Sequence, residues 1–170
     1  VGPFQVLFLQ HLFRDIPFTI LPILCGSFQL CLPHYAREDF LEKAGRFIEE
    51  LRSILEENTA RTLVVAGVDF SHIGPKFGHE TSARALASES KAHDTRLLDR
   101  LCALDAPGFW EESRSVNDRF NVCGFSAMAC MLEVLPEWRG EVLDYEVWHE
   151  KSTQSAVSFS AVAFSPVGNA

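Results

Sequence analysis

Two short segments of this sequence carry the residue types best suited to chemistry, and the first spans residues 67–74 (GVDFSHIG). An apolar run leads directly into Asp69 and His72, with a glycine on either side. Across such a turn both side chains can point into one pocket, where a His binds metal or carries a proton and an Asp orients it or adds a ligand. The alternative is that Asp69 caps the turn and His72 is an ordinary structural residue; spacing alone favours this alternative, because short motifs often match by chance.

The second segment spans residues 121–127 (NVCGFSA). Asn121 is a suitable N-cap residue, which predicts that Cys123 lies in the first turn of a helix. Backbone N–H groups at that position stabilise a thiolate, the form of cysteine that binds metal and attacks electrophiles. Gly124 would permit close approach of another group. A buried structural cysteine is an equally good interpretation on local grounds, since free cysteines are commonly buried.

The remaining histidines and cysteines are weaker candidates. We expect structural roles for His11 and His34, a loop position for His79 and Glu80, no shared ligand face for His93 and Asp94, and a rim position for His149. Cys25, Cys102 and Cys130 fall on apolar stripes and are predicted to lie in the core, where burial should make them slow to react. The cysteines number five and show no CxxC spacing, which favours a reducing cytoplasm over a disulfide framework.

The elements that must position these residues alternate between strands and helices. Helical patterns cover residues 4–13, 38–57, 86–105, 107–116 and 123–135. Continuous apolar runs at 18–24 and 62–68 predict strands buried on both faces, and two closing strands follow near 141–148 and 156–165. The alternation predicts a layered α/β fold with a central, mostly buried sheet and helices on both faces. We expect a single domain over 1–170, with residues 1–3 left by a cleaved tag or another change at the terminus.

Composition excludes several classes of protein. A hydrophobic fraction of 47% in 170 residues supports a folded core, and Lys+Arg 15 against Asp+Glu 23 gives a net charge of −8. That charge argues against non-specific nucleic-acid binding. No apolar run is long enough for a membrane helix, and the first residues do not resemble a signal peptide.

Five segments in order resemble the Memo-like family, also known as protein B of the AmmeMemoRadiSam system. These are FQVLFLQHLF, FTILPILCGS, TLVVAGVDFSHIGPKFG, NVCGFSAMACMLEVL and SAVSFSAVAFSP, and together they span residues 4–166. The resemblance implies a fold like that of the class III extradiol dioxygenases, which use non-haem Fe(II).

The resemblance also implies a pocket lined by two early histidines and by a later Asp, His and Cys. The later three match Asp69, His72 and Cys123, whereas the two early histidines have no counterpart. Family members carry Glu-His-Ser before the FQ segment, where this chain has residues 1–3 (VGP). The chain therefore resembles the C-terminal three-fifths of the family's domain, and we expect it to bind metal weakly or not at all, because a catalytic site normally has about three protein ligands.

Two functions are consistent with the resemblance. The first is a metal-dependent, dioxygenase-like oxidoreductase, with His72 and Asp69 as catalytic residues and Asp69, His72 and Cys123 as ligands of Fe(II). Copper and zinc are the alternatives, because a thiolate is a softer ligand than a carboxylate. The second is a non-catalytic signalling or adaptor module that binds metal or peptide in a redox-sensitive pocket. The expected partner is a small-molecule substrate or a peptide.

Overall fold

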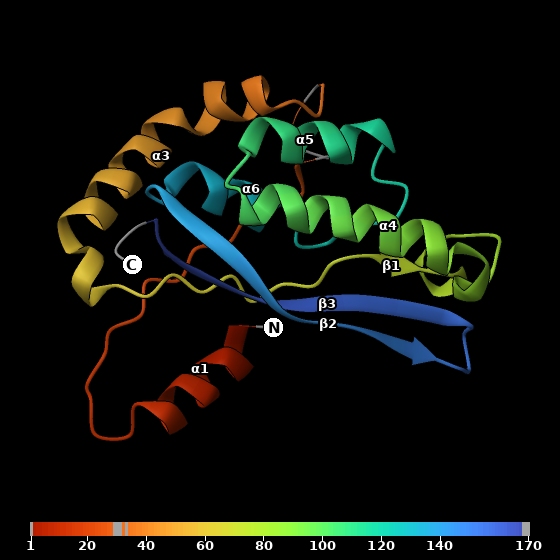
Figure 1. The fold of residues 1–170 in the computed structure, drawn as a ribbon, viewed down its shortest axis with the longest axis horizontal. Coiled ribbons are helices and arrows are strands. Elements are labelled where there is room, and N and C mark those ends of the chain that lie inside the picture. Colours follow the sequence, from red (N-terminus) through yellow and green to blue (C-terminus); the bar gives the residue numbers. More distant parts are fainter. Residues whose placement is uncertain (1, 29–31, 33, 168–170) are drawn as a thin grey trace.

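A computed structural model describes residues 2–28, 32 and 34–167 of the chain. The helices are α1 (Gly2–Leu12), α3 (Arg37–Asn58), α4 (Ala83–Cys102), α5 (Ala106–Ser115) and α6 (Phe125–Val134), with short 3-10 turns η1 (Thr59–Arg61) and η2 (Pro75–Phe77). The strands are β1 (His72–Ile73), β2 (Trp138–Glu150) and β3 (Ser155–Pro166). Figure 1 shows α3, α4, α5 and α6 gathered on one side of the strands and α1 on the other.

The strands form one small antiparallel sheet in the order β1–β3–β2. Strands β2 and β3 pair along nearly their whole length, from Trp138 opposite Pro166 to Glu150 opposite Ser155. Short strand β1 joins the other edge of β3, where His72 lies opposite Val157. The hairpin therefore fixes the position of the segment that contains His72.

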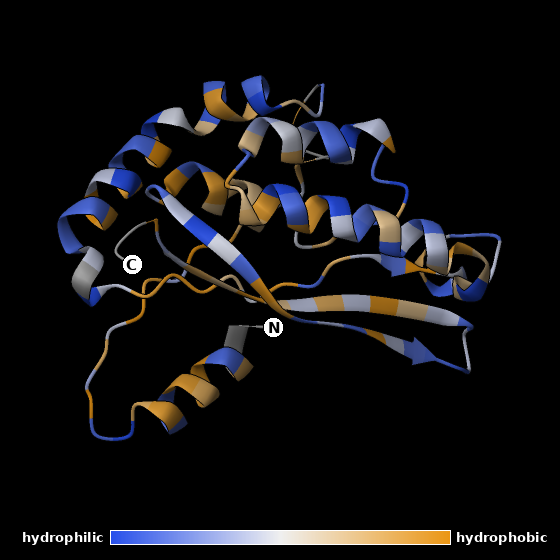
Figure 2. Cartoon of the chain, viewed as in Figure 1, coloured by the Kyte–Doolittle hydropathy of each residue, from blue (hydrophilic) through white to orange (hydrophobic). Residues whose placement is uncertain are grey.

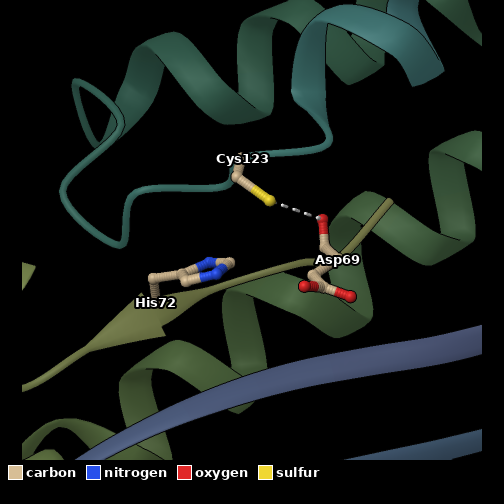
Figure 3. Close-up of side chains that lie close together, drawn as sticks. All are labelled: Asp69, His72 and Cys123. Atoms are coloured by element: carbon tan, nitrogen blue, oxygen red, sulfur yellow. Dashed lines mark hydrogen bonds between the residues drawn. The ribbon is translucent and has the colours of Figure 1, made fainter. Parts of the chain in front are cut away.

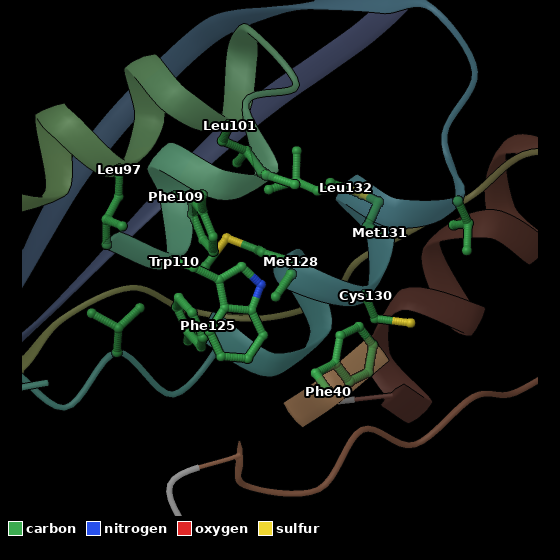
Figure 4. Packing of buried hydrophobic residues seen from close by; sticks show 14 of the residues in the cluster. Phe40, Leu97, Leu101, Phe109, Trp110, Phe125, Met128, Cys130, Met131 and Leu132 are labelled. Atoms are coloured by element: carbon green, nitrogen blue, oxygen red, sulfur yellow. The ribbon is translucent and has the colours of Figure 1, made fainter. Parts of the chain in front are cut away.

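An aromatic cluster at the centre of the core holds α5 against α6. The rings of Phe109 and Phe125 stack with centroids 5.0 Å apart, and Trp110 meets Phe125 edge-on at the same distance. All three side chains are buried (Figure 4). Since Phe125 is the first residue of α6, this packing fixes the start of the helix, immediately after Cys123 and Gly124. Aromatic pairs in this geometry contribute roughly 0.5–1.5 kcal/mol beyond the area they bury.

Helix α3 packs against α6 through one apolar face and one ion pair. Phe40, Ile48 and Leu55 are its buried residues, at a spacing that returns to one side of the helix. Arg37 donates two hydrogen bonds to the carboxylate of Glu133, from Nε at 2.6 Å and from Nη2 at 2.8 Å. The bidentate pair compensates for burial of the Glu133 side chain.

The predicted helices are confirmed, with boundaries shifted by a few residues, as are the two closing strands. The predicted buried strands at 18–24 and 62–68 are wrong: both segments are extended, and neither pairs in a ladder within the described part of the chain. Leu21 is 72% exposed and Leu63 is 64% exposed. An apolar run becomes a buried strand when neighbouring strands supply hydrogen bonds and a covering layer, and among the described residues none does so here.

The central, mostly buried sheet is consequently not observed. The described residues form a mixed helix and strand structure with a small antiparallel sheet, and strands β2 and β3 keep many exposed side chains. Figure 2 shows that hydrophobic residues continue along the extended segments that follow α1 and α3. No helix among the described residues is long and apolar enough to cross a membrane.

Candidate functional site

Asp69 and His72 lie where the extended chain meets the sheet. The backbone N–H of Phe70 donates to the carbonyl of Ser158 at 2.9 Å, and the N–H of Ser158 donates to the carbonyl of Ser71 at 3.0 Å. These bonds continue the pairing with β3 just before β1 begins. The segment is therefore held by β3 at the point where it presents Asp69 and His72.

Cys123 approaches this segment from the loop before α6. The N–H of Gly124 donates to the carbonyl oxygen of Asp69 at 3.0 Å, and the Cys123 thiol points to the same oxygen at 3.8 Å. A Cβ on residue 124 would lie 2.4 Å from that oxygen and 2.7 Å from a methyl carbon of Val68. The close approach expected at Gly124 is confirmed, and the backbone of Asp69 is the group that approaches.

The structure brings the three predicted site residues together. Their ligand atoms, the carboxylate oxygen of Asp69, a ring nitrogen of His72 and the Cys123 sulfur, all lie within 4.8 Å of one another. Figure 3 shows the three side chains converging from two separate segments. Asp69 and His72 are partly buried, whereas Cys123 is exposed. The group is thus accessible from solvent on the cysteine side.

One ring nitrogen of His72 is already committed to the backbone. Nδ1 lies 3.0 Å from the carbonyl oxygen of Phe70, and because a carbonyl can only accept, Nδ1 carries the proton. Nε2 is then the nitrogen left for a ligand or a mobile proton. The pKa of His72 is raised, mainly by its hydrogen bond with Cys123, while partial burial opposes that rise. The ring of Phe77 packs edge-on against the imidazole at 4.9 Å.

A buried carboxylate supports this segment from behind. Asp94, on α4, is 0% exposed and accepts hydrogen bonds from the hydroxyls of Ser71 at 2.6 Å, Ser158 at 2.5 Å and Tyr145 at 2.8 Å. Ser71 lies directly between Phe70 and His72, so the network joins the site segment to α4, β2 and β3. His149 lines a small cavity of about 100 Å³ beside these residues, consistent with its expected rim position.

Comparison with known proteins identifies the family of this chain. The family model described as "Memo-like protein" matches residues 3–163. The chain belongs to the Memo-like family. A MEMO1 family protein of Aquifex aeolicus is 27% identical over 164 residues, covering 95% of this chain and 39% of that protein. The MEMO1 family protein of Methanosarcina acetivorans is 30% identical over 145 residues, covering 83% of this chain and 45% of that protein.

A MEMO1 family protein of Thermus thermophilus is 35% identical over 97 residues, covering 56% of this chain and 28% of that protein. The Memo-like chain thus spans about half or less of the length of these relatives. No solved structure matches it significantly.

Asn121 of this Memo-like chain has a role that differs from the predicted one. It is not the N-cap of α6, which begins at Phe125 with Gly124 as the cap, so Cys123 precedes the helix and does not lie in its first turn. The Asn121 side chain instead donates to the carbonyls of His72 and Phe77, both at 3.2 Å. Its φ of 50° is left-handed, a conformation in which Asn is enriched. Asn121 therefore braces the loop that holds His72.

His79 adds a second brace to the same loop of the Memo-like chain. Its Nδ1 accepts from the N–H of Gly74 at 3.3 Å, and its Nε2 donates to the carbonyl of Arg119 at 2.8 Å. His79 lies in a loop, as expected, and hydrogen bonds to both of its ring nitrogens give it a structural role there. Sequence reasoning had no signal for the partners, because Arg119 is distant along the chain.

The other candidates lie away from the site. His93 is buried and bonds Glu112 at 3.0 Å, whereas His34 is exposed beside Asp39 and His11 is exposed. Cys130 is buried and Cys102 is partly buried, and burial raises the pKa of Cys102, as expected. Cys25 differs from the expectation for core cysteines: it is partly buried, but its pKa is lowered to about 7 by a hydrogen bond from Cys130. Cys31 lies outside the described residues.

Proposed function

We propose that Asp69, His72 and Cys123 bind a transition-metal ion and that this site serves a metal-dependent, dioxygenase-like oxidoreductase. The observation that carries the proposal is the convergence of three donor atoms of different kinds within 4.8 Å. Imidazole, thiolate and carboxylate together suit iron, copper and zinc, whereas Mg²⁺ and Ca²⁺ prefer oxygen ligands alone.

The orientation of His72 fits a metal ligand. A histidine that binds metal usually donates its other ring N–H to a carbonyl or a carboxylate, which fixes the ring and its tautomer. The Nδ1–H of His72 makes such a bond to Phe70, and the Asp94 network anchors the neighbouring Ser71. The imidazole of His72 therefore needs little reorganisation to bind an ion.

Oxidoreductase chemistry is inferred from the family. The Memo-like family resembles the class III extradiol dioxygenases in its layered fold, and a non-haem Fe(II) supplies electrons to O₂ when it is bound at such a site. Three protein donors leave coordination positions open for a small-molecule substrate. In this chain His72 would hold or release a proton at Nε2, with the carboxylate of Asp69 close enough to favour its charged form. We place this chemistry in the reducing cytoplasm, where Cys123 remains a free thiol.

A second function is favoured by the exposure of Cys123. The thiolate is a softer ligand than the carboxylate common at O₂-activating iron sites, and here it is the most accessible of the three donors. Both properties suit a non-catalytic module that binds metal or peptide and responds to oxidation. Copper and zinc would be its preferred ions.

A cobalt titration tests the proposed metal site. Co²⁺ reports a bound thiolate by charge-transfer absorption, and we expect this absorption with the wild-type protein and its loss in Cys123→Ser. His72→Ala should lower the affinity at least about tenfold, the effect of losing one well-oriented ligand contact of roughly 1.4 kcal/mol. Cys102→Ser and His11→Ala are matched controls and should bind as wild type. Identical titrations of wild type and Cys123→Ser would refute the site.

Oxygen uptake separates the two functions. The protein loaded anaerobically with Fe²⁺ is mixed with a catechol, and O₂ consumption is followed with an electrode. Consumption that needs His72 and Cys123 supports the oxidoreductase. Metal binding without O₂ consumption supports the binding module instead.

A further inference from the structure

The two extended segments, residues 18–24 and 62–68, leave a large apolar surface uncovered. Leu63, Val64 and Val65 are all exposed. Because successive side chains of an extended chain point to opposite faces, exposure of three consecutive residues means that neither face of this segment is covered. Every residue of the first segment is exposed as well. Both segments therefore have the composition of buried strands and the exposure of surface loops.

The backbone of these segments is also without partners. Within the described part of the chain, no backbone-to-backbone hydrogen bond involves residues 18–24 or 63–68. Pro22 removes one N–H donor from the first segment, whereas the second contains no proline and keeps a donor at every residue. Residues 62–68 thus present the open edge of a strand, ready to pair with another one.

Helix α1 connects the two segments but covers little of them. A Cβ on residue 67 would lie 2.8 Å from the side chain of Gln5, so the helix meets the second segment at Gly67. The rings of Phe13 and Phe18 pack edge-on at 5.9 Å, which joins the end of the helix to the first segment. Figure 2 shows hydrophobic residues along α1 and along both segments. These three elements together form one apolar surface, the open face.

The surface area of the chain indicates what kind of partner the open face requires. The chain exposes 11119 Å². A folded monomer of 19.0 kDa exposes about 8,400 Å², so the excess is about 2,700 Å². Permanent interfaces bury roughly 2,000–5,000 Å² over both partners. A short peptide would pair with one edge and leave the faces of both segments open. A bilayer would cover the side chains but leave the backbone groups unpaired, which is costly in hydrocarbon.

The comparison with relatives indicates which polypeptide has this size. The match to the Aquifex aeolicus protein covers 95% of this chain but only 39% of that protein, so the matched residues occur there beside a longer stretch of polypeptide. A second copy of this chain would instead bring a further net charge of −8 and the same unpaired segments to the interface. The observations therefore favour a different part of a Memo-like protein over a second copy.

We propose that the open face binds the part of a Memo-like protein that this chain does not span, and that this part adds a β-strand beside residues 62–68. Three observations carry the proposal: the exposure of both faces of the segments, their unpaired backbone, and the excess of surface. It does not depend on the metal site.

Complementation tests the proposal with the chain as it stands. The probe is the part of the Aquifex aeolicus protein that lies outside its match, co-expressed with this chain as a separate polypeptide. We expect the two to purify as a one-to-one complex. Amide exchange followed by NMR should slow at least about 100-fold at every second residue of 62–68 or more, because a strand paired along one edge bonds alternate N–H groups. No complex, or a complex in which these amides exchange as in the free chain, would overturn the proposal.

A charge on the open face separates this assembly from a general loss of stability. Val65→Glu places a carboxylate on the second extended segment, and Ile54→Glu places one on α3; the two wild-type side chains are 50% and 52% exposed. Both variants should fold as wild type, because neither charge is buried in the free chain. Val65→Glu should weaken the complex at least about 100-fold, since binding would bury an unpaired charge, and Ile54→Glu should leave it unchanged. Equal affinities of the two variants would refute the assigned surface.

Measurements on the free chain test the other occupants. We expect a monomer by light scattering and no binding to phosphatidylcholine vesicles. If residues 18–24 and 62–68 become protected from exchange in a concentration-dependent dimer, a second copy occupies the open face and the proposal is wrong. Protection that requires vesicles would overturn it in the same way, in favour of a lipid surface.

Discussion

The hydrogen bond with Cys123 is the main reason that the pKa of His72 is raised. The two side chains come from separate segments of the chain. The carbonyl oxygen of Asp69, on the His72 segment, joins these segments by accepting from the Gly124 N–H and from the Cys123 thiol. Protonation of the imidazole and the state of the thiol are therefore coupled. The site should therefore respond to pH through His72 and Cys123 even when neither metal nor substrate is bound.

Removal of the thiol should lower the pKa of His72. In Cys123→Ala the hydrogen bond that raises this pKa most is lost while the opposing burial remains, so the pKa of His72 should fall toward its ordinary value. The ring proton resonances of His72, followed by NMR against pH, measure the change. Cys102→Ala should leave the titration unchanged. A His72 titration that is the same in Cys123→Ala and wild type would contradict the coupling.

The same pair makes a pH-dependent contribution to stability. Because the pKa of His72 is higher in the folded protein than in the unfolded one, its contribution is fully present below pH about 6.5 and is lost as pH rises through the raised value. Urea unfolding of wild type and Cys123→Ala should therefore differ most in acid and converge above neutrality. A difference that grew with pH would show that the sign is wrong.

Loss of the imidazole should slow the reaction of Cys123 with alkylating reagents. His72 is the group placed to hold the proton that the thiol must lose, and Cys123 is exposed to reagent. With limiting iodoacetamide, peptide mapping should show slower labelling of Cys123 in His72→Ala and unchanged labelling of Cys25 and Cys102. If Cys123 reacts equally fast without His72, the histidine does not assist the thiol.

Asp94 should be important for stability although it does not touch the site. In the wild type, three hydroxyls donate to the Asp94 carboxylate, and Asp94→Asn replaces one of the acceptor oxygens with an amide that can only donate. Hydrogen bonds to a buried charged group contribute roughly 1.5–3 kcal/mol each. We expect a loss of about 2–4 kcal/mol in the free energy of unfolding by urea titration. Asp99→Asn, on the exposed face of the same helix, should change it by less than about 0.5 kcal/mol. Equal effects of the two substitutions would contradict this role of Asp94.

The helices and the site segments could be predicted from the sequence because their signals are local. Apolar residues at helical spacing mark α3 and α4, and an apolar run that ends in polar residues marks the segment with Asp69 and His72. The runs at 18–24 and 62–68 misled for a physical reason. Their composition reports a preference for burial, but it does not specify the neighbouring strand that would satisfy the backbone, and the described residues supply none.

The residues that support the site could not be predicted because their partners are distant in sequence. Asn121 matches an N-cap locally, yet its amide bonds the carbonyls of His72 and Phe77. Asp94 lies within a helical pattern and gives no local sign that hydroxyls from three other elements converge on it. Such networks depend on tertiary packing, which a pattern of residue types along one element does not contain.

Two glycine substitutions provide a paired test of the approach between Cys123 and Asp69. Gly124→Ala would place its Cβ 2.4 Å from the Asp69 carbonyl oxygen, so the backbone of one segment must move. Overpacking of this kind costs roughly 1–3 kcal/mol. Gly45→Ala adds the same methyl group to α3, where nothing lies within 4 Å of the new atom. It should stabilise the protein by about 0.5–1 kcal/mol, because alanine favours helix more than glycine does.

The two variants should also differ at the site itself. Displacement of Gly124 moves Cys123 away from Asp69 and His72, so Gly124→Ala should weaken the cobalt charge-transfer absorption and lower the pKa of His72 even at temperatures where the protein remains folded. Gly45→Ala should leave both unchanged. Since both substitutions add one methyl group, their difference isolates the contact at residue 124 from any general effect of replacing glycine. If Gly124→Ala unfolds with wild-type stability and binds cobalt as wild type does, then the close contact between the two segments does not hold Cys123 at the site.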